Sequence, residues 1–168
     1  MLQALEQDHP DHGDEVSRVL DALAVRGLTL AVAEGDSGGL LLEWLTAVPG
    51  SSAVVLGGVV AYHDELKQRL LGVEPETLAR YGAVSAETAR AMAVGVRELI
   101  RADMALATTG IAGPGGGTLS KPVGLAFVAV ADAERALVRE HRWQGQRGRN
   151  RQASAQAALR LALELLHA

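Results

Sequence analysis

The spacing of apolar residues along the chain predicts strands and helices in alternation. Short apolar runs at 28–33, 53–61, 103–109 and 123–131 are typical of buried strands, and we expect Gly57-Gly58 to break the second of them. The segment 136–143 predicts a fifth strand of mixed polarity near an edge. Apolar residues spaced three and four apart predict helices over 14–26, 38–48, 63–71, 75–81, 85–100 and 149–166. We therefore expect an α/β fold with a largely parallel sheet that helices cover on both faces.

The length of 168 residues is enough for one domain with a substantial core and too short for two generous ones. No internal repeat and no interior stretch of linker composition divides the sequence. We expect residues 1–13 to form a flexible leader and residues 14–168 to form a single domain.

The composition excludes several classes of protein. The chain has no cysteine, which rules out disulfides, thiolate zinc sites and cysteine nucleophiles. The net charge of -4 argues against nucleic acid as the main partner, because phosphate binding requires clustered positive charge. No apolar run approaches the ~20 residues of a membrane span, and the acidic N-terminus lacks the apolar segment of a signal peptide. We expect a cytoplasmic protein without a membrane partner.

The most informative segment is 109–124, which reads Thr-Gly-Ile-Ala-Gly-Pro-Gly-Gly-Gly-Thr-Leu-Ser-Lys-Pro-Val-Gly and joins two apolar runs. Its glycines permit close backbone approach, and its prolines stiffen the path. This composition predicts a built loop at the end of a buried strand that exposes backbone N–H groups and Lys121 to an anionic ligand. A purely structural turn is the alternative.

Three polar segments, at 34–39, 62–67 and 109–121, each follow one of the first three predicted strands. Ligands gather outside the carboxyl ends of parallel strands, so we expect these segments to meet. Lys67 and Lys121 are the two lysines among 16 cationic residues, and an amine, unlike a guanidinium, can lose its proton near neutral pH. We expect the side chains of Glu34, Lys67 and Lys121 to surround one cavity that takes a small phosphorylated molecule.

Three other motif interpretations fail. The string Gly-Asp-Ser-Gly-Gly at 35–39 occurs in trypsin-like proteases, but those are all-β proteins with a catalytic histidine and aspartate far upstream of the serine. Neither a Rossmann nor a P-loop fingerprint is present. His9 and His12 have no third ligand, so we expect neither a metal nor a cofactor.

Many short blocks together follow the pattern of one known family. They are Ala33-Glu34, Ser37-Gly38-Gly39, the segments 48–52, 57–62, 71–73, 82–85, 109–117 and 121–124, and single positions at Lys67, Gly145, Arg147 and Arg151. From about Asp14 to Leu166 the chain resembles the C-terminal domain of the competence/damage-inducible protein CinA. Stand-alone members of that family are nicotinamide-nucleotide amidohydrolases.

The resemblance implies a three-layer α/β/α sandwich with a mixed, mostly parallel five-stranded sheet, and it suggests a homo-oligomer. It also implies pyridine nucleotide (NAD) salvage, in which nicotinamide mononucleotide is hydrolysed to nicotinic acid mononucleotide and ammonia by a Ser/Lys dyad. Lys67 falls on the dyad lysine and Tyr62 on a site tyrosine. The candidate catalytic residues are Lys67, Ser37, Tyr62 and Glu34. The candidate substrate-binding residues are Gly35, Asp36, Gly38, Gly39, Thr109, Gly110, Gly113, Gly115, Gly116, Gly117, Lys121, Arg147 and Arg151.

The chain departs from the family at the nucleophile. The family string is Glu-Ser-Cys-Thr-Gly-Gly, whereas this chain has Gly35 at the serine, Asp36 at the cysteine and Ser37 at the threonine. The surrounding residues fix the register without a gap. The Cα atom of Ser37 can therefore lie up to roughly 7 Å from that of residue 35, which is too far for a relocated nucleophile.

Two hypotheses remain open. In the first, the chain is an active amidohydrolase that uses Ser37, or a water activated by Lys67 or Asp36. In the second, it is a catalytically silent or diverged module that retains the nucleotide pocket. A lysine base needs a pKa of about 7–8 instead of ~10.4, and a carboxylate at Asp36 facing the site would oppose that change.

Overall fold

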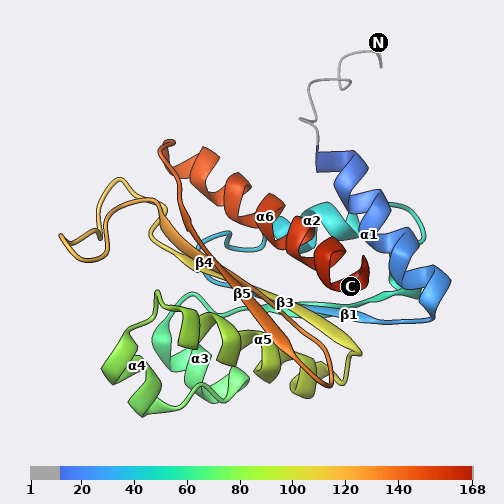
Figure 1. The fold of residues 1–168 in the computed structure, drawn as a ribbon, viewed down its shortest axis with the longest axis horizontal. Helices are drawn as coiled ribbons and strands as arrows, with labels where there is room; N and C mark the ends of the chain where they lie inside the picture. The colour runs from blue at the N-terminus through green and yellow to red at the C-terminus, as the bar shows by residue number, and fades with distance from the viewer. Residues whose placement is uncertain (1–11, 168) are drawn as a thin grey trace, which may run out of the picture.

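The computed structural model describes residues 12–167, which form one five-stranded sheet between two layers of helices (Figure 1). The strand order is β2-β1-β3-β4-β5, with β1 (Leu30–Glu34), β2 (Val55–Val60), β3 (Met104–Gly110), β4 (Leu125–Ala131) and β5 (Ala136–Arg142). Strand β1 lies between β2 and β3 and pairs in parallel with both, whereas β3–β4 and β4–β5 are antiparallel. The predicted three-layer α/β/α fold with a mixed sheet is confirmed.

The helices divide between the two faces of the sheet (Figure 1). One face is covered by α1 (His12–Arg26), α2 (Leu40–Thr46) and α6 (Arg147–His167), and the other by α3 (Asp64–Leu71), α4 (Pro75–Tyr81) and α5 (Ala86–Ile100). A short 3-10 helix, η1 (Ser51–Ala53), precedes β2. The predicted leader lies outside the described residues except for 12 and 13, which belong to α1.

Side chains of different size face the two layers. In β1, Leu30 and Val32 pack towards α1 and α6, whereas Ala31 and Ala33 pack towards α5. The same alternation continues in β3 and β4, because successive side chains of a strand point to opposite faces. The alanine-lined face lets α5 lie close to the sheet. None of the helices within residues 12–167 is long and apolar enough to cross a membrane.

The two glycines of β2 do not interrupt the strand, although the sequence suggested a break there. The strand continues through both, and its register against β1 shifts by one residue at Gly57, where φ is 143°. A Cβ atom at Gly58 would lie 2.6 Å from the carbonyl oxygen of Val32. Gly58 therefore allows a close strand-to-strand approach that a larger residue would prevent.

The carboxyl ends of the three parallel strands lie at the same level. Glu34 is in register with Val60 on one side and with Thr108 on the other. The pairing extends past the strands, because the N–H of Gly35 donates to the carbonyl of Thr108 at 2.8 Å and the N–H of Ala61 donates to the carbonyl of Glu34 at 2.9 Å. The segments that follow the three strands therefore start side by side.

The glycine-rich segment between β3 and β4 is a closed loop. The N–H of Ile111 donates to the carbonyl of Leu125, and the N–H of Gly124 donates to the carbonyl of Ile111, at 2.9 and 2.7 Å. Residues 112–123 thus leave and rejoin the sheet at one point. The loop projects beyond the carboxyl end of β3 (Figure 1).

The buried carboxylate of Glu34 holds the β1–α2 turn. Its Oε2 atom accepts hydrogen bonds from Ser37 Oγ at 2.6 Å and from the N–H groups of Gly39 and Leu41, both at 3.0 Å. Its Oε1 atom accepts from the N–H of Leu42 at 2.8 Å. The carboxylate therefore satisfies N–H groups at the start of α2 that have no partner within the helix.

We predict that Glu34→Gln destabilises the chain by roughly 2–3 kcal/mol, the value of hydrogen bonds to a charged group. The amide nitrogen of glutamine would face N–H donors and could not accept from them. Thermal unfolding should show the melting temperature falling by about 4–12 °C. Glu43→Gln, an exposed change in the same helix, is the control. Equal melting temperatures for the two variants would contradict this role.

Candidate functional site

A cavity of about 260 Å³ opens at the carboxyl end of the parallel strands. The three segments that the sequence predicted to meet all contribute to it. Its lining residues are Gly35, Asp36, Tyr62, Asp64, Lys67, Ala83, Val84, Thr109, Gly110, Ile111, Ala112, Gly113, Gly115, Gly116 and Arg147. Ala83 and Val84, from the turn between α4 and α5, fall in the block 82–85 that contributes to the family resemblance, but they were not predicted as site residues.

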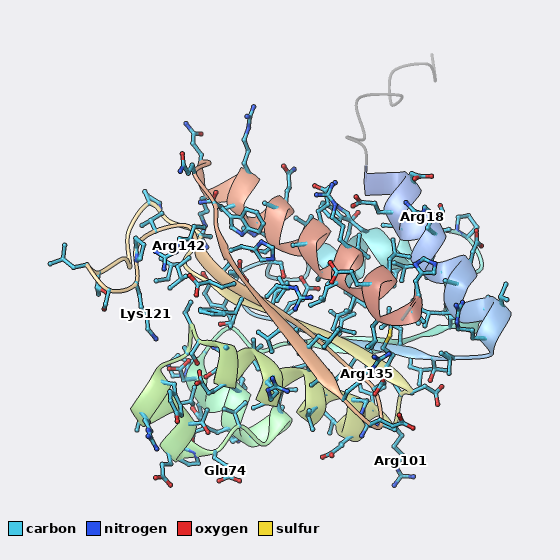
Figure 2. All side chains as sticks on the ribbon, in the orientation of Figure 1. Arg18, Glu74, Arg101, Lys121, Arg135 and Arg142 are labelled. Atoms are coloured by element: carbon cyan, nitrogen blue, oxygen red, sulfur yellow. The ribbon has the colours of Figure 1, made fainter. Side chains whose placement is uncertain are left out.

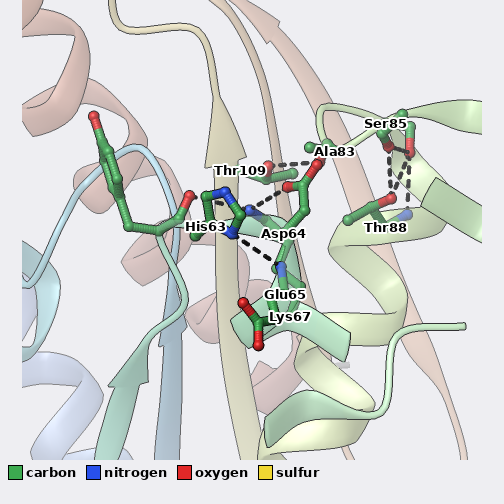
Figure 3. Close-up of polar contacts among 10 residues, drawn as sticks. His63, Asp64, Glu65, Lys67, Ala83, Ser85, Thr88 and Thr109 are labelled. Carbon is green, nitrogen blue, oxygen red and sulfur yellow. Dashed lines mark hydrogen bonds and ion pairs between the residues drawn. The ribbon is translucent and has the colours of Figure 1, made fainter. Parts of the chain in front are cut away.

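Lys67 is the buried cation of the cavity. It lies in α3, whose first residues follow the end of β2, and it is only 3% exposed. Its Nζ atom donates to Asp64 Oδ1 at 3.0 Å and to the carbonyl of Tyr62 at 3.4 Å (Figure 3). The side chain of Asp64 is half-exposed and sits one helical turn before the lysine. The ammonium is thus held at the cavity by an ion pair.

Arg147 connects three separate segments at the cavity. It lies in the first turn of α6, and its two terminal nitrogens donate to the carbonyl of Gly113 and to the hydroxyl of Tyr62, each at 2.8 Å. Nearby in α6, the Asn150 side chain is buried and donates to the carbonyl of Ala112 at 3.0 Å. Asn150 was not a predicted residue. Both contacts fix the glycine-rich loop against α6.

Ser37 and Glu34 lie outside the cavity. Ser37 is fully buried, and its hydroxyl is within hydrogen-bonding distance of both Glu34 Oε2 and Thr108 Oγ1, at 2.6 Å each. Among the described residues that line the cavity, none is a serine. Gly35, where the resemblance would place a nucleophile, does line it, and a Cβ atom there would lie 2.9 Å from the carbonyl oxygen of Thr108.

Asp36 lines the cavity with a carboxyl group that is poorly satisfied. Its Oδ2 atom accepts from Ser154 Oγ at 2.6 Å, and Ser154 in turn accepts from Trp143 Nε1 at 3.0 Å. Its Oδ1 atom is buried and has no hydrogen-bond partner among residues 12–167. Burial raises the pKa of Asp36, and the carboxylate of Glu34 adds to this, while the bond from Ser154 lowers it.

Several predicted binding residues are not part of the cavity wall. Lys121 and Arg151 do not line it, and neither do Gly38, Gly39 and Gly117. The expectation that Glu34, Lys67 and Lys121 surround one cavity is therefore wrong for Glu34 and Lys121.

Arg151 and Lys121, the two predicted cations that lie outside the cavity wall, bind backbone carbonyls. Arg151 donates twice to the carbonyl of Ser37, at 3.1 and 2.8 Å, and so holds the β1–α2 turn against α6. Lys121 binds the carbonyls of Tyr81 and Val84. The roles predicted for the residues that do line the cavity stay predictions.

Comparison with known proteins gives the family. The family model of the CinA C-terminal domain matches residues 14–166. The chain belongs to the CinA C-terminal domain family. A CinA-like protein of Acidobacterium capsulatum is 52% identical over 141 residues, which are 84% of this chain and 34% of that protein. A CinA-like protein of Gloeobacter violaceus is 50% identical over 151 residues, which are 88% of this chain and 35% of that protein. The chain thus spans about a third of the length of these curated relatives.

Solved structures of the CinA superfamily share the fold over almost all of the chain. The competence/damage inducible protein of Agrobacterium tumefaciens matches with a TM-score of 0.92 and 39% identity, covering 98% of this chain and 100% of that one. The CinA superfamily protein of Klebsiella pneumoniae 700603 matches with a TM-score of 0.90 and 32% identity, covering 94% and 99%. The mixed five-stranded sheet between two helix layers is therefore the fold of these CinA superfamily proteins.

We predict that Asp36→Asn stabilises the chain by roughly 1–3 kcal/mol at neutral pH, because it removes a carboxylate that burial disfavours. The pKa of Asp36 is raised above its ordinary 3.8 in the folded chain, so the folded state holds the proton more tightly. The contribution of this carboxyl group to stability is then greatest at low pH and falls as the pH rises from 3.8 through the folded-state pKa. Urea unfolding across pH 3–8 measures the difference.

Asp103→Asn is the matched control, for which we expect a change in stability of the opposite sign. Asp103 accepts from the N–H and the hydroxyl of Thr29, which lower its pKa. That variant should be less stable than the parent above pH 3.8, and the difference should shrink as the pH falls. Loss of stability in Asp36→Asn at neutral pH would show that the ionised group is needed for folding.

Proposed function

We propose that this chain binds a small phosphorylated nucleotide of the nicotinamide mononucleotide type and does not hydrolyse it by the Ser/Lys route. One observation carries the proposal: the cavity keeps a buried lysine and the glycine-rich loop, while residue 35 has no side chain and Ser37 faces away from the cavity. In this proposal the chain acts on pyridine nucleotide metabolism in the cytoplasm as a binding module.

The cavity suits such a ligand in the kind of groups that surround it. Its volume of about 260 Å³ lies just below the range of ~300–1,000 Å³ for small-molecule sites. Backbone from Gly110 to Gly116 forms one side, where the absence of side chains at the glycines lets a phosphate approach the main chain. Lys67 and Arg147 supply the positive charge, and arginine is well suited to bind a phosphate with two parallel hydrogen bonds.

The acyl-transfer step has no suitable hydroxyl. A nucleophile must stand within hydrogen-bonding reach of its base, and Ser37 is instead bonded to Glu34 and Thr108. Thr109, on β3, contributes a hydroxyl to the cavity wall, but this hydroxyl donates to the carbonyl of Ala83 at 2.7 Å. The Nζ atom of Lys67 is itself bonded to Asp64 Oδ1 at 3.0 Å, and among the described residues no serine hydroxyl lines the cavity beside it.

Hydrolysis by a water molecule is the second candidate function, because Asp36 and Lys67 both line the cavity. Either group in its unprotonated form could accept a proton from a water that attacks the amide carbon. The assay of ammonia release described below tests this candidate together with the proposal.

We expect isothermal titration calorimetry to detect binding of nicotinamide mononucleotide to the native chain. Nicotinamide riboside, which lacks the phosphate, should bind at least tenfold more weakly, because it lacks the charged hydrogen bonds to Arg147 and the loop. Arg147→Met should weaken binding of the mononucleotide to a similar extent, whereas Arg149→Met, an exposed change two residues further along α6, should not. Absence of heat and of a thermal shift with the native chain would reject the proposal.

We expect the native chain to release little ammonia from nicotinamide mononucleotide, and Gly35→Ser to raise the rate roughly 100-fold or more by restoring a nucleophile. A Cβ atom at residue 35 would lie 2.9 Å from the Thr108 carbonyl oxygen, so the backbone there has to shift. Gly35→Ala introduces the same atom without a hydroxyl and is the matched control. Substantial turnover by the native chain that disappears in Ser37→Ala would favour the amidohydrolase with Ser37 as nucleophile. Turnover that disappears in Asp36→Asn or Lys67→Met would favour the water mechanism.

A further inference from the structure

We propose that Lys121 is a positioning residue: its ammonium group holds the glycine-rich loop against the α4–α5 turn and so fixes two walls of the cavity. The Nζ atom donates to the carbonyl of Val84 at 2.8 Å and to the carbonyl of Tyr81. Figure 2 shows Lys121 extending from the loop towards the helices of the lower layer. The inference rests on the proposed function, since a bound ligand is what the two walls would enclose.

The α4–α5 turn has an unusual set of acceptors. Four consecutive carbonyls, at 81–84, each accept a hydrogen bond from a side chain. The carbonyl of Gly82 accepts from Ser85 Oγ and Thr88 Oγ1, which belong to the start of α5 (Figure 3). The other three are bound by side chains from distant parts of the chain, Lys121 and Thr109.

These distant contacts tie the turn to the cavity. Thr109 and two residues of the turn, Ala83 and Val84, line the cavity, and Thr109 Oγ1 donates to the carbonyl of Ala83 at 2.7 Å. Lys121 Nζ donates to the carbonyls of Tyr81 and Val84, which flank Ala83 in the turn. The backbone N–H of Lys121 donates to Thr118 Oγ1 of the same loop at 3.0 Å. The wall formed by Ala83 and Val84 is thus fixed from β3 and from the loop.

The position of Gly82 fits this role for Lys121. Gly82 has a φ of 77°, which favours glycine, and a Cβ atom there would lie 2.8 Å from the Nζ atom of Lys121. The ammonium therefore fills the space that a side chain at residue 82 would occupy. A lysine ammonium has three N–H donors. Lys121 uses two of them for backbone carbonyls of the turn, so backbone groups of the turn are its main partners.

The experiment compares Lys121→Met with the native chain in a calorimetric titration with nicotinamide mononucleotide. Methionine approximates the unbranched apolar stem of lysine and lacks the ammonium donors. We expect affinity to fall about tenfold or more, although Lys121 lies outside the cavity. Arg142→Met is the matched control, because Arg142 borders the same outer groove as Lys121 but pairs with Glu140. Its affinity should be unchanged.

Rescue separates positioning from a general effect of charge. The variant Lys121→Ala should lose affinity for the mononucleotide, and added propylammonium should restore at least half of the lost affinity. The reason is that propylammonium supplies N–H donors to the two carbonyls. Tetramethylammonium at the same concentration has the same charge without donors and should restore nothing. Native affinity in folded Lys121→Met, or equal rescue by the two cations, would overturn the inference.

A measurement on the native chain covers the case in which the variants do not fold. Lys67 and Lys121 are the two lysines of the sequence, so intact mass and peptide mapping follow the acetylation of each. We expect Lys121 to react at least tenfold more slowly in the folded chain than in guanidinium chloride. Equal rates would contradict the inference. A native chain that binds no mononucleotide but protects Lys121 would reject the proposed function and leave the positioning contact in place.

Discussion

The geometry of the site depends on one buried carboxylate. An α-helix that starts directly after a strand leaves N–H groups without partners at its first turn, and burial makes that expensive. Glu34, the last residue of β1, meets this need by accepting from three N–H groups of the α2 start and from Ser37. Because the strand fixes Glu34 and the helix fixes its partners, the residues between them have little freedom. The carboxylate therefore decides which of those residues face the cavity.

This constraint explains why Ser37, two positions along the turn from residue 35, does not face the cavity. Within the turn, residues 35 and 36 line the cavity, whereas Ser37 is directed inward to Glu34 and Thr108. Turning its hydroxyl outward would break the contact with Glu34 and leave a buried polar group with one partner fewer. Asp36 places a second buried carboxyl group near the first; burial raises the pKa of Asp36, and repulsion from Glu34 adds to this. Neither Gly35 nor Asp36 presents a hydroxyl to the cavity.

The sequence predicted the fold well because its signals are local and consistent. Continuous apolar runs and turn residues located the strands and most helices, and the topological rule for parallel strands located the cavity. The direction of individual side chains depends on contacts between distant residues, which no local pattern contains. Lys121 was expected to meet an anion, yet carbonyls 37 and 40 positions earlier in the chain bind it. Ser154 and Asn150 were missed because small polar residues within an amphipathic helix give no sign of what they contact. The two glycines of β2 were misread as a break because close approach to β1 cannot be recognised from composition.

The positive groups around the cavity differ in how much charge they keep available for a ligand. Lys67 is paired with a carboxylate, so much of its field is neutralised at the cavity. Arg147 and Lys121 are held by a phenol and by carbonyls, which fix the cations without cancelling their charge. A guanidinium has five N–H donors, and two terminal nitrogens of Arg147 each use one of them here. Further donors of Arg147 remain for an anion, and the contacts to Tyr62 and Gly113 orient the group before the ligand arrives. A phosphate at the glycine-rich loop would then meet a positive group that is already placed, and the entropy cost of ordering a long side chain would be small.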